Sequence, residues 1–343
     1  MFIMSDQNAP TETLSPSRQV MQFLWPGAMA AEAICVAAKL GIADLLGEDL
    51  KSASELARAV GAEAATLARL LAALATMGIF SGNHEDGFRN TELSKTLRNG
   101  HPESMRNWAI FLGAPFVLRP LGELEQAVKT GATPFDRSFG KGFFDYLADN
   151  PSDSAIFNAA MSSGSSMSAS AIVAAYDFSR FRQIVDVGGG HGALLEGILL
   201  ANPMPHGVLF DLPSVVAGAD SLRTGSLAGR CQVVGGDFFQ FVPEGDAYLL
   251  KGIVHDWSDG DAERILRCCR RSITADGRLI LLETVLRPHD KPASGMMDLL
   301  MLVLVGGRER TEQDFRALLG QGGFSLLRVI QAGPSFLLEC APL

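Results

Sequence analysis

The hydrophobic and polar positions of this chain follow different periods in its two halves. In the first hundred residues, apolar side chains recur at helical spacing over residues 20–46, 52–60 and 63–77. Ser52 is followed three residues later by Glu55, a capping-box signature, and Gly78 follows the last apolar stretch. The pattern therefore predicts helices over these three segments.

Residues 79–93 predict a small antiparallel hairpin, because two short strand-like runs flank a turn rich in Asn, Asp and Gly. Helices followed by a hairpin form a winged-helix pattern. Residues 101–180 carry a mostly helical pattern. We interpret the Ser-rich stretch 161–170 as helix too, because no proline interrupts it and small residues allow close approach to a ligand or another backbone.

From Phe181 onward, short apolar runs alternate with helical stretches. The expected strands lie within residues 183–190, 206–213, 231–239, 246–253 and 277–286. This alternation predicts a parallel sheet with crossover helices. Residues 324–342 contain two further strands around a turn at 332–334, which we expect to form a hairpin at the sheet edge. Ligands of such sheets bind beyond the carboxyl ends of the strands.

Composition and charge narrow the class of protein. The 343 residues are 47% hydrophobic, so a sizeable core is expected, and the net charge is -9. The candidate recognition helix of the winged-helix pattern carries only one basic residue, Arg69, and the hairpin contains His84, Glu85 and Asp86 against Arg89. Phosphate contacts need several Lys or Arg on one face. We therefore expect no nucleic-acid partner, and a ligand-sensing DNA-binding regulator remains the alternative from another class.

The N-terminal apolar helix, residues 21–46, is apolar on too many sides for a lone surface helix and predicts packing against a second copy, hence a homodimer. The five cysteines are odd in number and form no C-x-x-C pair, which disfavours disulfides and a structural zinc site. We expect a reduced cytoplasmic protein with no metal. The N-terminus shows no secretory signal, and the apolar run 299–305 is far below the ~20 residues that span a bilayer, so no membrane partner is expected.

A glycine loop follows the first strand of the second half. Gly188, Gly190 and Gly192 allow a tight turn and a close backbone approach to a ligand. The same residues satisfy G-x-G-x-x-A, so a dinucleotide such as NAD is one interpretation. Asp186 favours a different cofactor, because its carboxylate would repel a pyrophosphate and attract an ammonium group. S-adenosyl-L-methionine carries an ammonium and a sulfonium and no phosphate.

The next two strand ends carry further ligand-binding candidates. Asp211 lies about twenty residues past the glycines, where an acid accepts both ribose hydroxyls of either cofactor. It also has a structural interpretation as a helix cap before Pro213. Asp237 is suited to accept from an adenine amino group, and Phe238 to lie against the purine face. The alternative for this pair is a turn followed by core phenylalanines.

Six sequence words occur together in this chain: DVGGGHG, DLP, GDFF, LLKGIVHDWSD, LLETVL and GGRERT. With them the chain resembles the S-adenosylmethionine-dependent small-molecule O-methyltransferases of the caffeic-acid and bacterial natural-product type. The resemblance implies an α/β class I methyltransferase fold, a Rossmann-like, mostly parallel seven-stranded sheet with an N-terminal winged-helix-like dimerisation domain. It implies a dimerisation domain over residues 1–105, a connector contributing to the substrate pocket over 106–180, and a cofactor-binding catalytic domain over 181–343.

The resemblance also implies catalytic roles. His255 matches the family's catalytic histidine, Glu283 and Glu309 match the two acids that hold it, and Lys251 matches a cofactor contact. Methyl transfer from a sulfonium needs an aligned nucleophile and removal of one proton. A histidine with an ordinary pKa of ~6.5 is largely neutral at cellular pH and able to accept the proton of a phenol. Helix capping accounts for Ser258 and the residues after it, but not for His255.

Four residues fall on substrate-contacting positions of plant relatives, and each is also compatible with ordinary core packing: Phe157, Met161, Met297 and Met301. Gly164 replaces a polar contact of those relatives, and the stretch 298–306 is one residue shorter than theirs. We therefore predict a small aromatic substrate with a bulkier ring system than a phenylpropanoid, such as a phenazine, a polyketide or a similar secondary metabolite. Methylation of a carboxylate or a nitrogen, or a repurposed cofactor-binding relative, remains the alternative.

Overall fold

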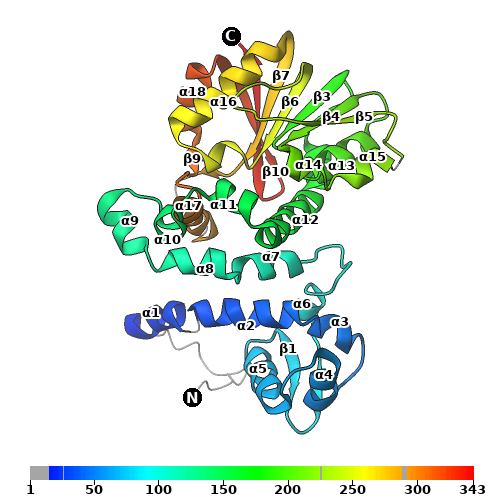
Figure 1. Cartoon of the computed structure of the whole chain (residues 1–343), viewed down its shortest axis with the longest axis vertical. Coiled ribbons are helices and arrows are strands. Elements are labelled where there is room, and N and C mark those ends of the chain that lie inside the picture. The colour runs from blue at the N-terminus through cyan, green and yellow to red at the C-terminus, as the bar shows by residue number, and fades with distance from the viewer. Residues whose placement is uncertain (1–14, 26, 225, 288–291) are drawn as a thin grey trace. The chain divides into compact units, whose positions relative to one another are not determined.

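The structure is a computed structural model that describes residues 15–25, 27–224, 226–287 and 292–343. It contains two compact units, Met1–His101 and Pro102–Leu343 (Figure 1). The predicted boundaries at residues 105 and 180 stay a prediction.

The first unit is helical with one hairpin. Its elements are α1 (Pro16–Leu24), α2 (Gly27–Lys39), α3 (Ile42–Leu46), α4 (Ala53–Val60), α5 (Ala64–Thr76), β1 (Phe80–Asn83), β2 (Gly87–Asn90) and α6 (Glu92–Lys95). The capping box that begins α4 is confirmed, since Ser52 Oγ accepts from the Glu55 N–H at 3.2 Å. The predicted first helix is divided into three, and Gly41 adopts a left-handed φ of 64° before α3.

The hairpin of β1 and β2 is antiparallel, as predicted, and pairs Phe80 with Asn90. Its turn forms because the Asn83 side chain accepts from the backbone N–H groups of Glu85 and Asp86. Phe80 and Phe88 are fully buried and attach the hairpin to the helices of this unit.

The second unit begins with six helices, which confirms the helical interpretation of residues 101–180. They are α7 (Arg106–Leu112), α8 (Pro115–Leu121), α9 (Leu124–Thr130), α10 (Pro134–Phe139), α11 (Phe143–Asp149) and α12 (Pro151–Ala175). The Ser-rich stretch lies inside α12, a helix of 25 residues. Its small residues let α7 approach closely: a Cβ on Gly164 would lie 3.2 Å from Trp108 Nε1.

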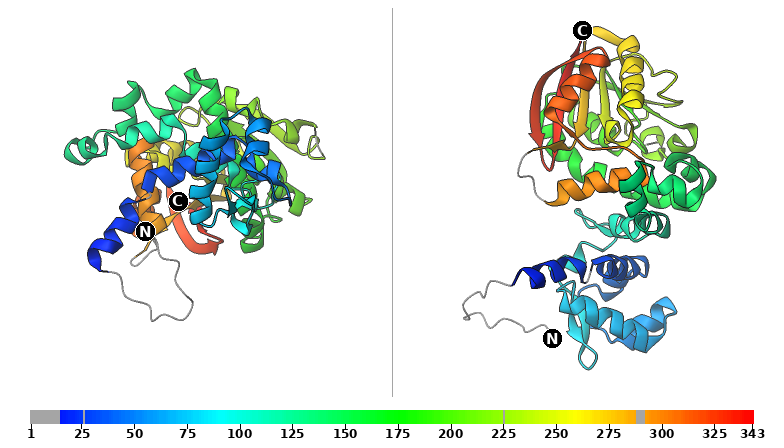
Figure 2. Two further views of the ribbon diagram at one scale, coloured as in Figure 1. Left: turned by 90° about the horizontal axis from the view of Figure 1, so that it is seen from below. Right: turned by 90° about the vertical axis from the view of Figure 1, so that its left-hand side faces the viewer.

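Within the described residues, seven strands form the main sheet, in the order β10-β11-β7-β6-β3-β4-β5. The parallel strands are β3 (Gln183–Val187), β4 (His206–Asp211), β5 (Cys231–Gly235), β6 (Gly245–Lys251) and β7 (Ile273–Glu283). The last two, β10 (Phe324–Ala332) and β11 (Ser335–Pro342), form the predicted antiparallel hairpin, and β11 pairs with β7. The right-hand view of Figure 2 shows this hairpin at one edge of the sheet.

Helices cover both faces of the sheet, so successive side chains of its central strands are buried on opposite sides. On β7, Leu279 and Leu281 pack against one face, whereas Ile280 and Leu282 pack against the other. The first face is covered by α16 (Asp259–Ser272) and α18 (Glu312–Gln321). The second is covered by α12, α13 (Ala193–Ala201), α14 (Pro213–Val216) and α15 (Asp220–Thr224). Burial on both faces explains the nearly continuous apolar runs of these strands.

The remaining elements lie near the carboxyl ends of the strands: the 3₁₀ turn η1 (Val254–Asp256), β8 (Val285–Leu286), α17 (Pro292–Leu304) and β9 (Arg310–Thr311). β8 and β9 form a short parallel pair. Within the described part of the chain, no single helix is long and apolar enough to cross a membrane; α4 and α5 reach that length only as a pair bent by 116°.

Candidate active site

A cavity of about 780 Å³ opens at the carboxyl ends of the parallel strands. The loops after β3, β4, β5, β6 and β7 line one part of it, and helices α7, α11, α12 and α17 line the other. Its volume lies in the upper part of the range of about 300–1,000 Å³ typical of small-molecule pockets. The cavity therefore has the size for two ligands side by side, a cofactor against the sheet and a second molecule against the helices.

The glycine loop joins β3 to α13 on the sheet side of the cavity. Gly188, Gly190 and Gly192 have φ values of 69°, 61° and 82°, a region that other residues rarely adopt. At Gly188 space is also limiting, because a Cβ there would lie 2.4 Å from Ile253 Cδ1. The loop is tied to the next strand, since the Gly190 N–H donates to Asp211 Oδ2 at 2.8 Å. A ligand bound here would lie against the backbone of the glycine loop on one side and the Asp211 carboxylate on the other.

Asp186 lies beneath this loop rather than on the cavity wall. It is 1% exposed, and its Oδ2 has no hydrogen-bond partner. Burial raises the pKa of its carboxyl to about 7, and the positive charge of Lys251 offsets part of this rise. Burial likewise lowers the pKa of Lys251, whereas the charges of Asp186 and Glu283 raise it. An orphaned buried acceptor directly below the loop fits a cationic ligand above it.

The other predicted cofactor residues all line the cavity: Gly188, Gly190, Asp211, Asp237, Phe238 and Lys251. Asp211 accepts from both Gly190 N–H and Leu212 N–H, and burial raises the pKa of its carboxyl. Asp237 accepts from Phe239 N–H at 2.8 Å. Phe238 packs edge-on against Trp257, with ring centroids 6.0 Å apart. These residues fit a ligand with an ammonium, a ribose and a flat purine.

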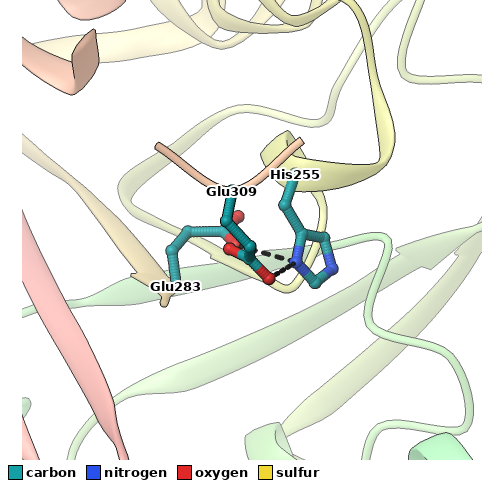
Figure 3. Close-up of side chains that lie close together, drawn as sticks. All are labelled: His255, Glu283 and Glu309. Atoms are coloured by element: carbon teal, nitrogen blue, oxygen red, sulfur yellow. Dashed lines mark hydrogen bonds and ion pairs between the residues drawn. The ribbon is translucent and has the colours of Figure 1, made fainter. Parts of the chain in front are cut away.

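His255 stands at the junction of the two parts of the cavity, on η1. Its Nδ1 lies 3.0 Å from Glu309 Oε1 and 3.7 Å from Glu283 Oε2 (Figure 3). Glu283 ends β7, and its Oε1 accepts from the backbone N–H groups of Ile253 and Val254. Both glutamates are buried, and each has one oxygen, Oε2, without a hydrogen-bond partner. The structure thus brings together the three residues that the resemblance assigned to catalysis.

The loop before β9 is closely packed on η1, and this packing positions Glu309. The Arg308 N–H donates to the His255 carbonyl at 2.9 Å. The guanidinium of Arg310 is fully buried and donates to the carbonyls of Val254 and Trp257. Gly307 allows this approach, because a Cβ there would lie 2.0 Å from the His255 carbonyl oxygen.

The protonation of His255 differs from the expectation. Burial lowers the pKa of the imidazole, but the charges of Glu283, Asp256 and Glu309 outweigh burial and raise it to about 10. The surrounding carboxyls therefore favour the imidazolium more than the ordinary pKa assumed in the sequence analysis would. The physical reason is the number of carboxyls around one ring in a poorly solvated place.

Asp256 is a residue that the sequence analysis missed. Its Oδ1 lies 3.5 Å from His255 Nε2, and burial raises the pKa of its carboxyl to about 7. Its position beside His255 in the HDWSD word was the available signal. Asp298 was missed as well; its Oδ1 accepts from the Glu309 N–H at 2.8 Å.

The four predicted substrate residues all line the helical part of the cavity: Phe157, Met161, Met297 and Met301. Aromatic neighbours that the sequence analysis did not single out complete this wall. Phe144 stacks on Trp257 with centroids 5.5 Å apart, and Phe157 meets Phe111 edge-on at 5.8 Å. Trp108 occupies the space that Gly164 leaves free. A flat aromatic ring fits such a wall.

Among the described residues, one group has the geometry to hold a metal ion, and it is the cluster around His255. Ligand atoms of His255, Glu283 and Glu309 lie within 4.8 Å of one another. The expectation of no metal stays a prediction.

Comparison with known proteins identifies the family. Residues 121–325 match the model described as the O-methyltransferase domain, and residues 24–100 match the O-methyltransferase dimerisation domain. The chain belongs to the S-adenosylmethionine-dependent O-methyltransferases, an enzyme family with a class I methyltransferase fold and an N-terminal helical dimerisation domain. The predictions of family, fold class, enzyme class and cofactor are confirmed.

Two relatives match nearly end to end. Phenazine O-methyltransferase PhzM of Lysobacter antibioticus is 40% identical over 96% of this chain and 97% of its own. Mitomycin biosynthesis 6-O-methyltransferase of Streptomyces lavendulae is 38% identical over 97% of both chains. Phenazine-1-carboxylate N-methyltransferase of Pseudomonas aeruginosa, 35% identical over 92% of this chain and 94% of its own, shows that nitrogen is methylated by some relatives.

Two solved structures of similar proteins have the same fold as this chain. The crystal structure of LaPhzM has a TM-score of 0.91 at 39% identity, covering 96% of this chain and all of that one. NcsB1 from neocarzinostatin biosynthesis, solved with S-adenosylmethionine and 2-hydroxy-5-methyl naphthoic acid, has a TM-score of 0.81 at 32% identity, covering 93% and 98%.

Proposed function

We propose that this protein transfers the methyl group of S-adenosylmethionine to a hydroxyl of a polycyclic aromatic secondary metabolite, of the phenazine or polyketide kind, with His255 as the proton acceptor. The observation that carries the proposal is the position of His255. It lines the cavity between the cofactor-binding loops and the aromatic helical wall, and Glu309 holds its Nδ1.

We assign the residues of the cavity to the cofactor or to the acceptor according to the part of the cavity in which they lie. When bound, S-adenosylmethionine supplies an activated methyl group on its sulfonium. We assign its ribose hydroxyls to Asp211, its adenine to Asp237 and Phe238, and its ammonium to the glycine loop above Asp186. Phe157, Met161, Met297 and Met301 hold the acceptor ring flat, so that its oxygen meets the methyl in line and water is excluded.

His255 removes the proton. With its Nδ1–H donated to Glu309, Nε2 is the nitrogen that accepts from the acceptor hydroxyl. The carboxyls around His255 raise its pKa well above the ordinary value, which makes the ring a stronger base toward a phenol with a pKa of ~10. Glu283 and Glu309 stabilise the imidazolium that results. A sulfonium bound beside His255 would oppose this imidazolium and would lower the pKa of the ring.

The first unit is proposed to form the dimer, as a winged-helix-like module. Helix α1 and its C-cap residue Trp25 expose several large apolar side chains: Val20, Met21, Phe23, Leu24 and Trp25. Exposed apolar side chains in such number on one short helix are typical of an interface.

Methylation of an aromatic nitrogen is the second candidate, because two relatives are named for it, 8-amino-8-demethylriboflavin N,N-dimethyltransferase and phenazine-1-carboxylate N-methyltransferase. One assay separates the two. The protein is incubated with S-adenosylmethionine and matched pairs of hydroxy- and amino-substituted phenazines and naphthalenes, and products are located by mass and fragmentation. Oxygen methylation of the hydroxy member supports the proposal, whereas turnover of the amino members alone contradicts it.

A further inference from the structure

We propose that the acceptor is a ring system without a carboxylate, neutral or cationic, and that the enzyme discriminates against carboxylated rings of the same shape. The inference rests on the proposed function and specifies its substrate class. It would set this chain apart from relatives whose names or bound molecules carry a carboxylate.

The helical wall of the cavity offers no positive charge to an acceptor. Among the described residues that line the cavity, those from α7, α11, α12 and α17 are apolar or neutral apart from Asp145. The polar members are small hydroxyls and one amide, Asn158, whose Nδ2 is 3.4 Å from Ser154 Oγ. An acid entering this space would lose water without gaining a partner, which is costly for a charged group.

The cations that do line the described cavity are already matched by acids. The charges of Asp186 and Glu283 raise the pKa of Lys251. His191 belongs to the glycine loop and lies against Gly218. Both basic side chains lie on the sheet side of the cavity, to which we assign the cofactor.

The same holds for His255, which is surrounded by three carboxyls, Asp256, Glu283 and Glu309. Asp145 at the exposed end of the helical wall adds a further negative charge. Among the described lining residues, no basic side chain without acidic neighbours therefore faces the acceptor, so an acid gains no free counter-charge there, whereas an amine can lie near Asp145.

The test measures binding of rings that differ only in charge. Calorimetry on the full-length protein saturated with S-adenosylhomocysteine compares a hydroxynaphthoic acid with its carboxamide, which has nearly the same shape without the charge. The unsubstituted hydroxynaphthalene and an aminomethyl derivative complete the series. We expect the acid to bind at least about 10-fold more weakly than the amide, and the amine to bind no more weakly than the amide.

Variants of the wall test the cause. Asn158→Arg places a cation among the neutral residues of α12 and is expected to reduce the acid-to-amide difference at least fivefold. Asn158→Gln, the matched neutral control, leaves the difference unchanged. Asp145→Asn removes an exposed charge and reduces the difference by about two- to threefold, because solvent screens it.

The outcomes separate this inference from the proposed function. Equal or tighter binding of the acid overturns the inference, even if phenols are methylated. Preference for the amide with no methyl transfer to any hydroxyl supports the inference and contradicts the proposed function. If no ring of the series binds, both are wrong.

Discussion

Glu309 accepts a hydrogen bond from His255 Nδ1 at 3.0 Å, across 54 residues of sequence (Figure 3). The contact joins the loop before β9 to the turn after β6. It selects the tautomer that leaves Nε2 as the acceptor, and it places a second carboxylate beside Glu283. The reactivity of His255 is therefore decided by a loop that is remote in sequence.

Replacing His255 by Ala is expected to lower kcat for a phenolic acceptor by about 10²–10⁴-fold, because the proton then has no positioned acceptor. Calorimetry with S-adenosylhomocysteine should show a Kd within about twofold of wild type. His206→Ala, an exposed histidine at the start of β4, is the control and should change neither quantity. Retention of wild-type kcat by His255→Ala would contradict the assignment of the base.

Replacing Glu309 by Gln is expected to lower the pKa of His255 from its value of about 10 by on the order of one unit. The pKa falls because a neighbouring carboxylate stabilises the imidazolium. Without that carboxylate, the ring loses its proton at a lower pH. Nuclear magnetic resonance of ¹³C-labelled histidine reads this pKa in the ligand-free protein.

The matched control for this titration is Glu312→Gln, an exposed acid of α18 that pairs with Arg316. It should leave the His255 titration unchanged. A wild-type pKa near ~6.5, or the same value in wild type and Glu309→Gln, would show that the carboxyls do not act on the ring as described.

Replacing Gly307 by Ala is expected to destabilise the second unit by about 1–3 kcal/mol and to lower kcat, since the added Cβ would lie 2.0 Å from the His255 carbonyl oxygen. Thermal unfolding and the methyl-transfer assay measure the two effects. Gly320→Ala in α18 is the control, because its Cβ meets nothing within 4 Å and Ala favours helix. Equal unfolding midpoints for Gly307→Ala and wild type would contradict the tight contact.

Replacing Asp211 by Asn is expected to weaken S-adenosylhomocysteine binding by about 10-fold, equivalent to ~1.4 kcal/mol. The carboxylate accepts from Gly190 and Leu212 N–H, and an amide would turn its own NH₂ toward one of these donors. Calorimetry measures the change, with the exposed Asp220→Asn as control. Unchanged affinity in Asp211→Asn would remove Asp211 from the cofactor site.

Replacing Phe23 by Asp is expected to convert a dimer into a monomer of 36.6 kDa, because this side chain is 82% exposed on α1 and a charge there opposes an apolar interface. Light scattering after gel filtration gives the mass. Val128→Asp, at a residue 76% exposed on α9, should leave the mass unchanged. A monomeric wild-type protein would exclude the proposed dimer.

The order of helices and strands could be predicted from the sequence, because each element depends on residues that are close together in the chain. Ser52 and Glu55 are three residues apart, so their capping box was visible before the structure. The strand-end residues Asp211 and Asp237 could be grouped for a similar reason: parallel strands place their carboxyl ends along one edge, and the loops there must meet.

Other features depend on packing that no local pattern encodes. Glu283 and Glu309 were assigned to His255 by family resemblance, since no spacing rule connects residues 54 positions apart. Asp186 was expected to act beside the loop, and its burial beneath the loop depends on how Gly189 and Leu209 pack over it.

The pattern of residues thus encoded the order of elements and the candidate ligand-binding residues at the strand ends, because hydrophobic period and turn chemistry are local properties. The cofactor and the partners of His255 came from the family resemblance. The protonation of His255 and the charge of the acceptor space were decided by tertiary structure. Both depend on desolvation and on charges gathered from separate elements, and these vary steeply with distance in a poorly hydrated interior.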